Sequence, residues 1–373
     1  MDFQNMAYMW SNYTLLLYFG IIASCYIICV FCKNQYILQF GIYKTKIQVS
    51  LLFTGLILIF FKGFGTAGRD LRSGYYMNFL SATSMDDFRD KSIEIGYRVL
   101  NVIIRNITDQ YWVFIFIISL LTIIPVLKIV KKYWNKIDGP LTILLFVSVF
   151  YISGFSPLRA YLASSIALFA FDAMVEKNAK KAFIWIVISM CFHISMAFLF
   201  LPYIFCFFKI FNKKFIVASL IILFLIFYIE RNSIVSILAG SERYFNYGLA
   251  DSIEFGFEQI AYYLPFFIII YLGRKNNDKN FYKTSFVYLC TGFCFGMLGY
   301  IVPIFGRTHV LFLPVIIIAG YYLKFLKNKY ITCKWLINFT TILYCLARFW
   351  IYIYQYYNLE DIMPYTNIFG MII

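Results

Sequence analysis

The segment GFGTAGRDLRSGYY (63–76) brings two arginines, a carboxylate and tyrosines close together in the sequence. Arg69 and Arg72 carry planar guanidiniums that can hold phosphate through two hydrogen bonds each. Asp70 between them can accept a proton or orient a hydroxyl group, and Tyr75 adds an aromatic ring. A salt bridge between an arginine and Asp70 at a helix end explains the same residues equally well. The segment is a candidate anion site with both interpretations open.

Glu94 is a second candidate, in the sequence SIEIGYRVL with Tyr97 and Arg98 close behind it. Burial among apolar residues disfavours the charged form of a carboxyl group and raises its pKa, which suits a general base. A structural ion pair with a neighbouring arginine is the alternative.

Arg159 lies in FSPLRAYLASSIALFAF, where Pro157 predicts the first turn of a helix. A cation near a helix N-terminus is electrostatically unfavourable on its own. An anion bound there would satisfy both the helix dipole and the guanidinium. The pattern predicts that Arg159 binds an anion.

The chain has only two histidines, and both lie in apolar sequence. His193 occurs in MCFHISMAFLFLP, and His309 follows Arg307 in GRTHVLFLP. In water such a histidine is usually a core residue, whereas inside a membrane an ionisable side chain is functional by default. Arg243 in SERYFNYG is a further candidate, and Arg348 in CLARFW suits an interfacial residue better.

The composition requires a lipid environment around these residues. Of 373 residues, 62% are hydrophobic and 14% are charged, and the mean hydropathy is +0.75. A globular protein has roughly 45–50% apolar and about 25% charged residues. The net charge of +15 comes from lysines dispersed in short clusters between apolar runs, which argues against a nucleic-acid partner.

We expect neither a metal nor a cofactor. The nine cysteines have no histidine or carboxylate at ligand spacing, and Asp86, Asp87 and Asp90 lie in a polar stretch typical of a solvated loop. No Walker motif or dinucleotide fingerprint occurs, and the loops expected to be cytoplasmic are too short to hold a nucleotide-binding domain.

Apolar runs long enough for membrane helices recur along the whole chain. The sequence therefore predicts an all-α polytopic membrane protein with about twelve spans, forming a single domain over 1–373. The spans lie near 13–32, 47–63, 111–130, 140–154, 158–175, 182–192, 194–208, 215–229, 259–272, 283–303, 308–326 and 335–354. Because lysine clusters flank both ends of 182–208, two short helices meeting at His193 are favoured over one long helix.

The lysines also predict the orientation. Of the 22 lysines, 20 fall in or beside the loops 33–46, 128–139, 176–181, 209–214, 273–283 and 324–334, which should therefore be cytoplasmic. Both termini and the longer loops 65–110 and 231–258 then face outward. Ten of the eleven arginines lie on or near the outer side, against the usual orientation signal. We expect an outer anion site, and an ordered first loop with short amphipathic helices on the membrane surface.

The order of these motifs resembles a known family. GRDLRSGYY, EIGYRVL, LRAYLASSIALFAF, FHISMAFLFLP, GRTHVLFLP and MPYTNIF together look like the EpsG-like group of Wzy-type polysaccharide polymerases, over about residues 60–370. LRAYLASSIALFAF and FHIS are the most specific of them. The chain departs from the family in having Ala160 after the arginine, where Gln is common, and Arg69 before Asp70, where a small or polar residue is common.

The resemblance implies a GT-C-like membrane glycosyltransferase in the bacterial inner membrane, with an active site that faces outward. Its donor and acceptor would be glycans on undecaprenyl diphosphate, destined for O-antigen, capsule or exopolysaccharide. A chain-length regulator and a flippase of the same pathway are possible partners. In this interpretation Arg159, Arg307 and one of Arg69 or Arg243 hold the diphosphate. His193, Asp70 and Glu94 compete as the base.

Two other functions fit part of the pattern. An O-antigen ligase, or another transferase acting on lipid-linked sugars, would use the same donor chemistry with a different acceptor. A flippase or transporter would place its charges along a midplane cavity and often shows inverted repeats. In this chain the unusual charges gather at one interface, and no internal repeat is visible.

Overall fold

The computed structural model describes residues 10–32, 35–40, 43–72, 74–88, 93–208, 212–239, 256–274, 278–302, 305 and 312–373. The chain divides into two compact units. The first consists of Met1–Ser165 and Lys327–Ile373, and the second of Ile166–Leu326. Each unit is described separately below.

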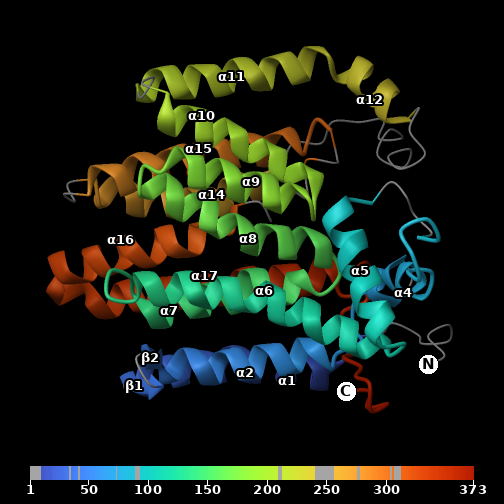
Figure 1. The fold of residues 1–373 in the computed structure, drawn as a ribbon. Helices are drawn as coiled ribbons and strands as arrows, with labels where there is room; N and C mark the ends of the chain where they lie inside the picture. Colours follow the sequence, from blue (N-terminus) through green and yellow to red (C-terminus); the bar gives the residue numbers. More distant parts are fainter. Residues whose placement is uncertain are drawn as a thin grey trace. The chain divides into compact units, whose positions relative to one another are not determined.

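The first unit is a bundle of apolar helices (Figure 1). Its long elements are α1 (Asn12–Phe31), α2 (Val49–Gly63), α6 (Tyr111–Tyr133), α7 (Gly139–Leu145) and α17 (Lys334–Tyr356). Helix α7 continues through a π-helical turn (Phe146–Tyr151) into a 3-10 turn (Ile152–Gly154). Helix α2 packs against α6 and α1, while α7 packs against α1 and α17. The core of this unit therefore lies between the long helices.

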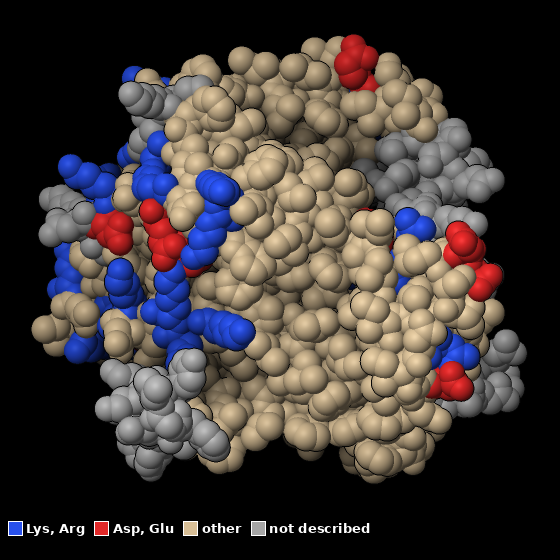
Figure 2. All heavy atoms as spheres, viewed as in Figure 1, with Lys and Arg blue, Asp and Glu red and all other residues tan. Residues whose placement is uncertain are grey.

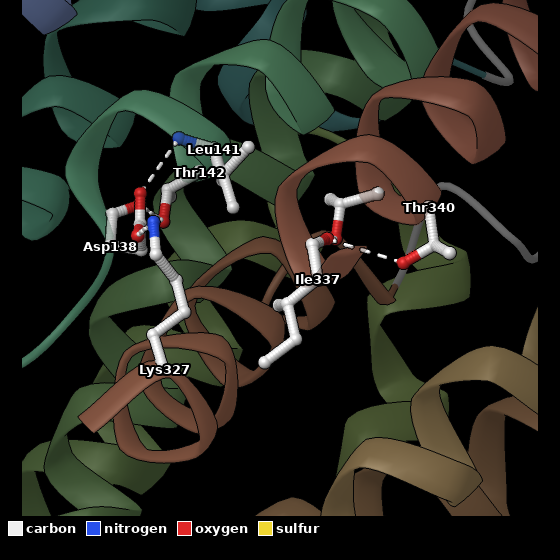
Figure 3. A network of polar contacts seen from close by, with 7 residues as sticks. Asp138, Leu141, Thr142, Lys327, Ile337 and Thr340 are labelled. Carbon is white, nitrogen blue, oxygen red and sulfur yellow. Dashed lines mark hydrogen bonds and ion pairs between the residues drawn. The ribbon is translucent and has the colours of Figure 1, made fainter. Parts of the chain in front are cut away.

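Side chains cap the first turn of α7 (Figure 3). Asp138 accepts a hydrogen bond from the amide of Leu141 at 3.2 Å, which satisfies one of the free donors in the first turn. Lys327 Nζ, at the end of α16 (Val315–Lys329), donates to Asp138 Oδ2 at 2.5 Å. This contact ties the start of α7 to the segment that leads into α17.

Three short helices gather at one end of the first unit, beside the C-terminus (Figure 1). They are α3 (Arg69–Arg72), α4 (Gly74–Leu80) and α5 (Ile95–Ile107). Helix α5 buries Tyr97, Asn101 and Ile104, and its opposite face exposes an apolar stripe. That stripe consists of Ile95, Val99, Ile103 and Ile107. The described residues of 65–110 thus form short helices as expected, and α5 is amphipathic, while their place on the membrane surface stays a prediction.

A two-stranded antiparallel hairpin occupies most of the predicted loop 33–46. Strand β1 (Gln35–Phe40) pairs with β2 (Tyr43–Gln48) in the register Gln35↔Gln48 to Phe40↔Tyr43. The sequence analysis expected no strand. Aromatic and β-branched residues such as Tyr36, Ile37 and Thr45 favour strands, and the short connection sets the register. Among the described elements the remainder is helical, so the all-α prediction holds for the architecture.

The second unit contains the remaining helices. Helix α8 (Leu158–Val175) begins in the first unit and ends in the second, and α16 begins in the second and ends in the first. Between them lie α9 (Ala179–Met190), a 3-10 helix (Ile194–Leu199), α10 (Phe200–Phe207), α11 (Lys213–Ile229), α12 (Arg231–Ala239), α14 (Glu258–Leu272) and α15 (Lys279–Leu298). Most of the predicted second outer loop, 240–255, lies outside the described residues.

The chain breaks at His193, as the lysine clusters predict. Helix α9 ends at Met190, and His193 adopts an extended conformation immediately before the 3-10 helix. The ring of Phe183, early in α9, lies 6.3 Å from the ring of Tyr203 in α10. The segment therefore turns back on itself, and the prediction of two short helices is confirmed.

The helices identify a membrane protein. Among the described residues, four helices are long and apolar enough to cross a membrane, namely Asn12–Phe31, Tyr111–Tyr133, Leu158–Val175 and Ile331–Tyr356. Shorter apolar helices include Val49–Gly63, Gly139–Gly154, Ile194–Phe207 and Glu258–Leu272. In Figure 2 the charged side chains lie near helix ends. The surface along the middle of the helices carries no charged side chain in this view. The exposed leucines and isoleucines of α11 illustrate a flank that suits lipid.

Candidate functional site

The turn between α2 and α3 is held in place by the C-terminal segment. The amide of Thr66 donates to the carbonyl of Thr366 at 2.7 Å, and the two threonine hydroxyls are also 2.7 Å apart. The amide of Ile368 donates to the carbonyl of Phe64 at 3.0 Å. Residues near the end of the chain thus fix the segment GFGTAGRD, which carries the first group of candidates.

Gly68 allows this turn to approach Phe155, the residue that follows the 3-10 turn before α8. Its φ is +121°, a conformation that residues with a side chain rarely adopt. Its amide donates to the carbonyl of Asp361 at 3.0 Å. A β-carbon on Gly68 would lie 2.7 Å from the carbonyl oxygen of Phe155, which is closer than packing permits. The next residue, Ser156, accepts from the amide of Asp70 at 3.4 Å, so Gly68 brings Asp70 toward the start of α8.

Gly68→Ala is expected to lower the free energy of unfolding by about 1–3 kcal/mol, because it adds both backbone strain and a steric clash. Gly74→Ala is the matched control, since a β-carbon there meets nothing within 4 Å. Thermal unfolding in detergent measures both variants. Equal melting temperatures for Gly68→Ala, Gly74→Ala and the unmodified chain would contradict this account of the turn.

The two arginines of GRDLR have different surroundings. Arg72 donates from Nε to the carbonyl of Thr66 at 2.9 Å and from Nη2 to Thr366 Oγ1 at 2.8 Å. Arg69 is exposed, and its Nη1 donates to the carbonyl of Leu359 at 3.5 Å. Both guanidiniums partly offset the burial that raises the pKa of Asp361. Arg72 therefore helps to fix the turn, while Arg69 is accessible to a ligand.

Arg159 lies at the centre of the site, in the first turn of α8. Its Nη1 donates to Glu94 Oε2 at 2.6 Å, and the side chains are 18% and 7% exposed, respectively. The guanidinium carbon lies 5.8 Å from the ring centre of Tyr75 and 5.7 Å from that of Tyr97, within cation–π range. We call Tyr75, Glu94, Tyr97 and Arg159 the Arg159 cluster.

Three separate segments supply this cluster. Tyr75 comes from α4, Tyr97 from α5, and Glu94 is the residue that precedes α5. The carboxylate of Glu94 makes no capping hydrogen bond to its own helix, although carboxylates often do so at that position. It is directed to Arg159 instead. The sequence analysis gave Glu94 and Arg159 separate roles, with an arginine pair as the alternative for Glu94, and the structure pairs the two.

The tyrosines of the cluster are neutral hydrogen-bonding groups. Burial raises the pKa of Tyr75, and the nearby Arg159 guanidinium partly offsets this effect. Burial also raises the pKa of Tyr97 far above its usual range. Both hydroxyls therefore keep their protons at neutral pH, so neither tyrosine acts as a proton acceptor there.

Lys62 is a buried cation that the sequence analysis did not select. It lies at the end of α2, 3% exposed, and its Nζ donates to the carbonyl of Gly154 at 2.7 Å. That carbonyl ends the 3-10 turn just before the chain enters α8 at Leu158. Lys62 was detectable in the sequence, because it is one of two lysines outside the predicted cytoplasmic loops.

The remaining candidates are not part of the Arg159 cluster. His193 belongs to the second unit, and its Nδ1 lies 3.3 Å from Ser195 Oγ. Arg243, Arg307 and His309 lie outside the described residues. The structure thus brings Glu94, Arg159 and Tyr75 together and places Asp70 beside Ser156. It leaves the other assignments as predictions.

The sequence of the chain matches a known protein family. The model of the EpsG family matches residues 46–367. The chain belongs to the EpsG family. EpsG is a Wzy-like polymerase family, so the resemblance seen in the motifs is confirmed. No curated protein and no solved structure matches the chain.

The match to the EpsG family includes the whole site. Lys62, Asp70, the Arg159 cluster and Thr366 all fall between residues 46 and 367. No group of three or more histidine, cysteine or acidic residues in the described part of this EpsG-family chain could hold a metal ion. The charges that the described site offers to a ligand are guanidiniums and carboxylates.

Proposed function

We propose that this EpsG-family chain is a polysaccharide polymerase. It joins oligosaccharide repeat units carried on undecaprenyl diphosphate at the outer face of the bacterial cytoplasmic membrane. The product would be O-antigen, capsule or exopolysaccharide. Family membership and the apolar helices support this proposal. The observation that carries it is the mostly buried Arg159–Glu94 pair beside Tyr75 and Tyr97.

The reaction requires two kinds of assistance. A hydroxyl of the incoming repeat unit attacks the anomeric carbon of the growing chain, and the bond from that carbon to the lipid diphosphate breaks. The leaving diphosphate gains negative charge, which fixed guanidiniums can stabilise. The attacking hydroxyl loses a proton, which a carboxylate or imidazole must accept. A site with paired arginine and carboxylate groups next to aromatic rings offers both.

The proposed roles follow from these requirements. Arg159 binds the diphosphate, and the accessible Arg69 is the second arginine that can bind it. Arg72 holds the turn between α2 and α3 in place. Glu94 and Asp70 are the candidate bases on this side, and His193 remains a separate hypothesis in the second unit. Tyr75 contacts sugar. We keep Arg243, Arg307 and His309 as proposed ligand-binding residues on sequence grounds.

The proposal includes a GT-C-like arrangement with about twelve spans and outward-facing termini. The fold-back at His193 supports it, because Lys181 and Lys213 flank the returning segment. A single cysteine at either position, in a variant that lacks the native cysteines, is expected to react with a membrane-impermeant maleimide only after the membrane is permeabilised. Labelling of the two positions from opposite sides would contradict this topology.

The experiment that tests the function uses purified protein in liposomes with a lipid-linked repeat unit. A ladder of glycans that differ by one repeat is the expected product. Transfer to a lipid A core without a ladder would favour a ligase, and movement across the bilayer without new bonds would favour a flippase. A chain-length regulator is expected to alter the ladder's distribution and not its formation.

A further inference from the structure

The guanidinium of Arg159 already has an anion beside it, from the chain itself. Glu94 Oε2 lies 2.6 Å from Arg159 Nη1, a short charge-assisted hydrogen bond. Both side chains are largely withdrawn from water. Solvent therefore screens the attraction between the two charges only weakly. Any anion that binds Arg159 must compete with this carboxylate.

The surroundings favour an anion at this point whatever its source. Arg159 lies in the first turn of α8, whose free amides carry partial positive charge. The electron-rich faces of Tyr75 and Tyr97 stabilise the guanidinium and contribute no net negative charge. One carboxylate brings one negative charge, whereas a diphosphate brings at least two and several acceptor oxygens. The diphosphate is therefore the stronger ligand once both are available.

We propose that Glu94 and the diphosphate of the lipid-linked donor compete for Arg159, so that donor binding displaces Glu94 from the guanidinium. This inference rests on the proposed function, because it takes Arg159 as the diphosphate ligand. It goes further because it links the residue that binds the diphosphate, Arg159, to a candidate base, Glu94.

The displacement changes the chemistry of Glu94. A buried carboxylate that loses its guanidinium partner binds a proton more readily, because both burial and the lost charge favour the neutral form. Glu94 would then become a better proton acceptor only when the leaving group occupies the site. The pair would thus keep Glu94 a weak base until the diphosphate of the donor occupies the site.

The test measures binding of inorganic pyrophosphate and of farnesyl diphosphate to the full-length chain in detergent. Glu94→Gln removes the competing charge and is expected to bind both probes about tenfold more tightly than the unmodified chain. Arg159→Gln is expected to lose most of the binding. Asp109→Asn is the matched control, because Asp109 pairs with Arg105 in an exposed contact, and it should leave binding unchanged.

The outcomes separate this inference from the proposed function. Binding that is lost in Arg159→Gln but is equal or weaker in Glu94→Gln would overturn the competition and leave the diphosphate role of Arg159 intact. Binding that is absent throughout, or unaffected by Arg159→Gln, would overturn both. Should Glu94→Gln fail to fold, Glu94→Asp serves instead, because its shorter side chain weakens the pair, and unchanged binding in that variant would count against the inference.

Discussion

Arg159→Lys is expected to reduce polymer formation about 100-fold, the loss typical when one donor to a developing anion is removed. Lysine keeps the positive charge, but it has no planar fork that can hold a diphosphate through two hydrogen bonds. It also alters the cation–π contacts that the guanidinium makes with the rings of Tyr75 and Tyr97. Ladder formation by the purified variant measures the effect.

Arg105→Lys is the control for this substitution. Arg105, in the last turn of α5, pairs with Asp109 just beyond the end of that helix, and Asp109 is 82% exposed, so the pair contributes little. The control should form ladders at the normal rate. If Arg159→Lys also forms normal ladders while folded and inserted, then Arg159 is only an electrostatic anchor or has only a structural role.

The second large effect concerns the base. At least one of Glu94→Gln, Asp70→Asn and His193→Ala is expected to lower the rate of bond formation about 100-fold or more, because general-base catalysis contributes that much. The structure favours Glu94, which contacts Arg159, and Asp70, whose amide contacts Ser156 near the start of α8. The rate at saturating donor is the measurement.

Asp109→Asn again serves as the control, since it removes a carboxylate of the same loop at an exposed position. A variant that binds diphosphate normally and yet forms bonds slowly would identify the base. Full activity in all three variants would mean that the proton acceptor lies elsewhere in the chain.

Local signals were sufficient for most of the helices. Apolar runs of the right length predicted α1, α6 and α17, because a membrane helix satisfies its backbone internally and needs only apolar side chains. The lysine clusters predicted the break at His193, since both ends of that segment carry the same orientation signal. The hairpin in 35–48 was missed because strand propensity in a short segment between two predicted spans is a weak signal beside the membrane pattern.

The site was predictable by residue type and not by pairing. Arg159 was selected because a cation at a helix N-terminus needs an anion, and the structure provides one 65 residues earlier in the sequence. No local pattern encodes a contact of that separation. The same holds for Thr66 and Thr366, which meet only because the C-terminal segment folds back onto the turn before α3. The position of Lys62 outside the predicted cytoplasmic loops could have singled it out, whereas its burial and its contact with Gly154 depend on tertiary packing.

The most direct test of the account measures lipid diphosphate release and glycan bond formation together, in the presence of EDTA. The central claim is that guanidiniums alone stabilise the departing diphosphate. It predicts that ladders form in EDTA and that one undecaprenyl diphosphate is released for each new bond. Bond formation that stops in EDTA and returns with magnesium or manganese would contradict the claim, as would polymer growth without release of the lipid diphosphate.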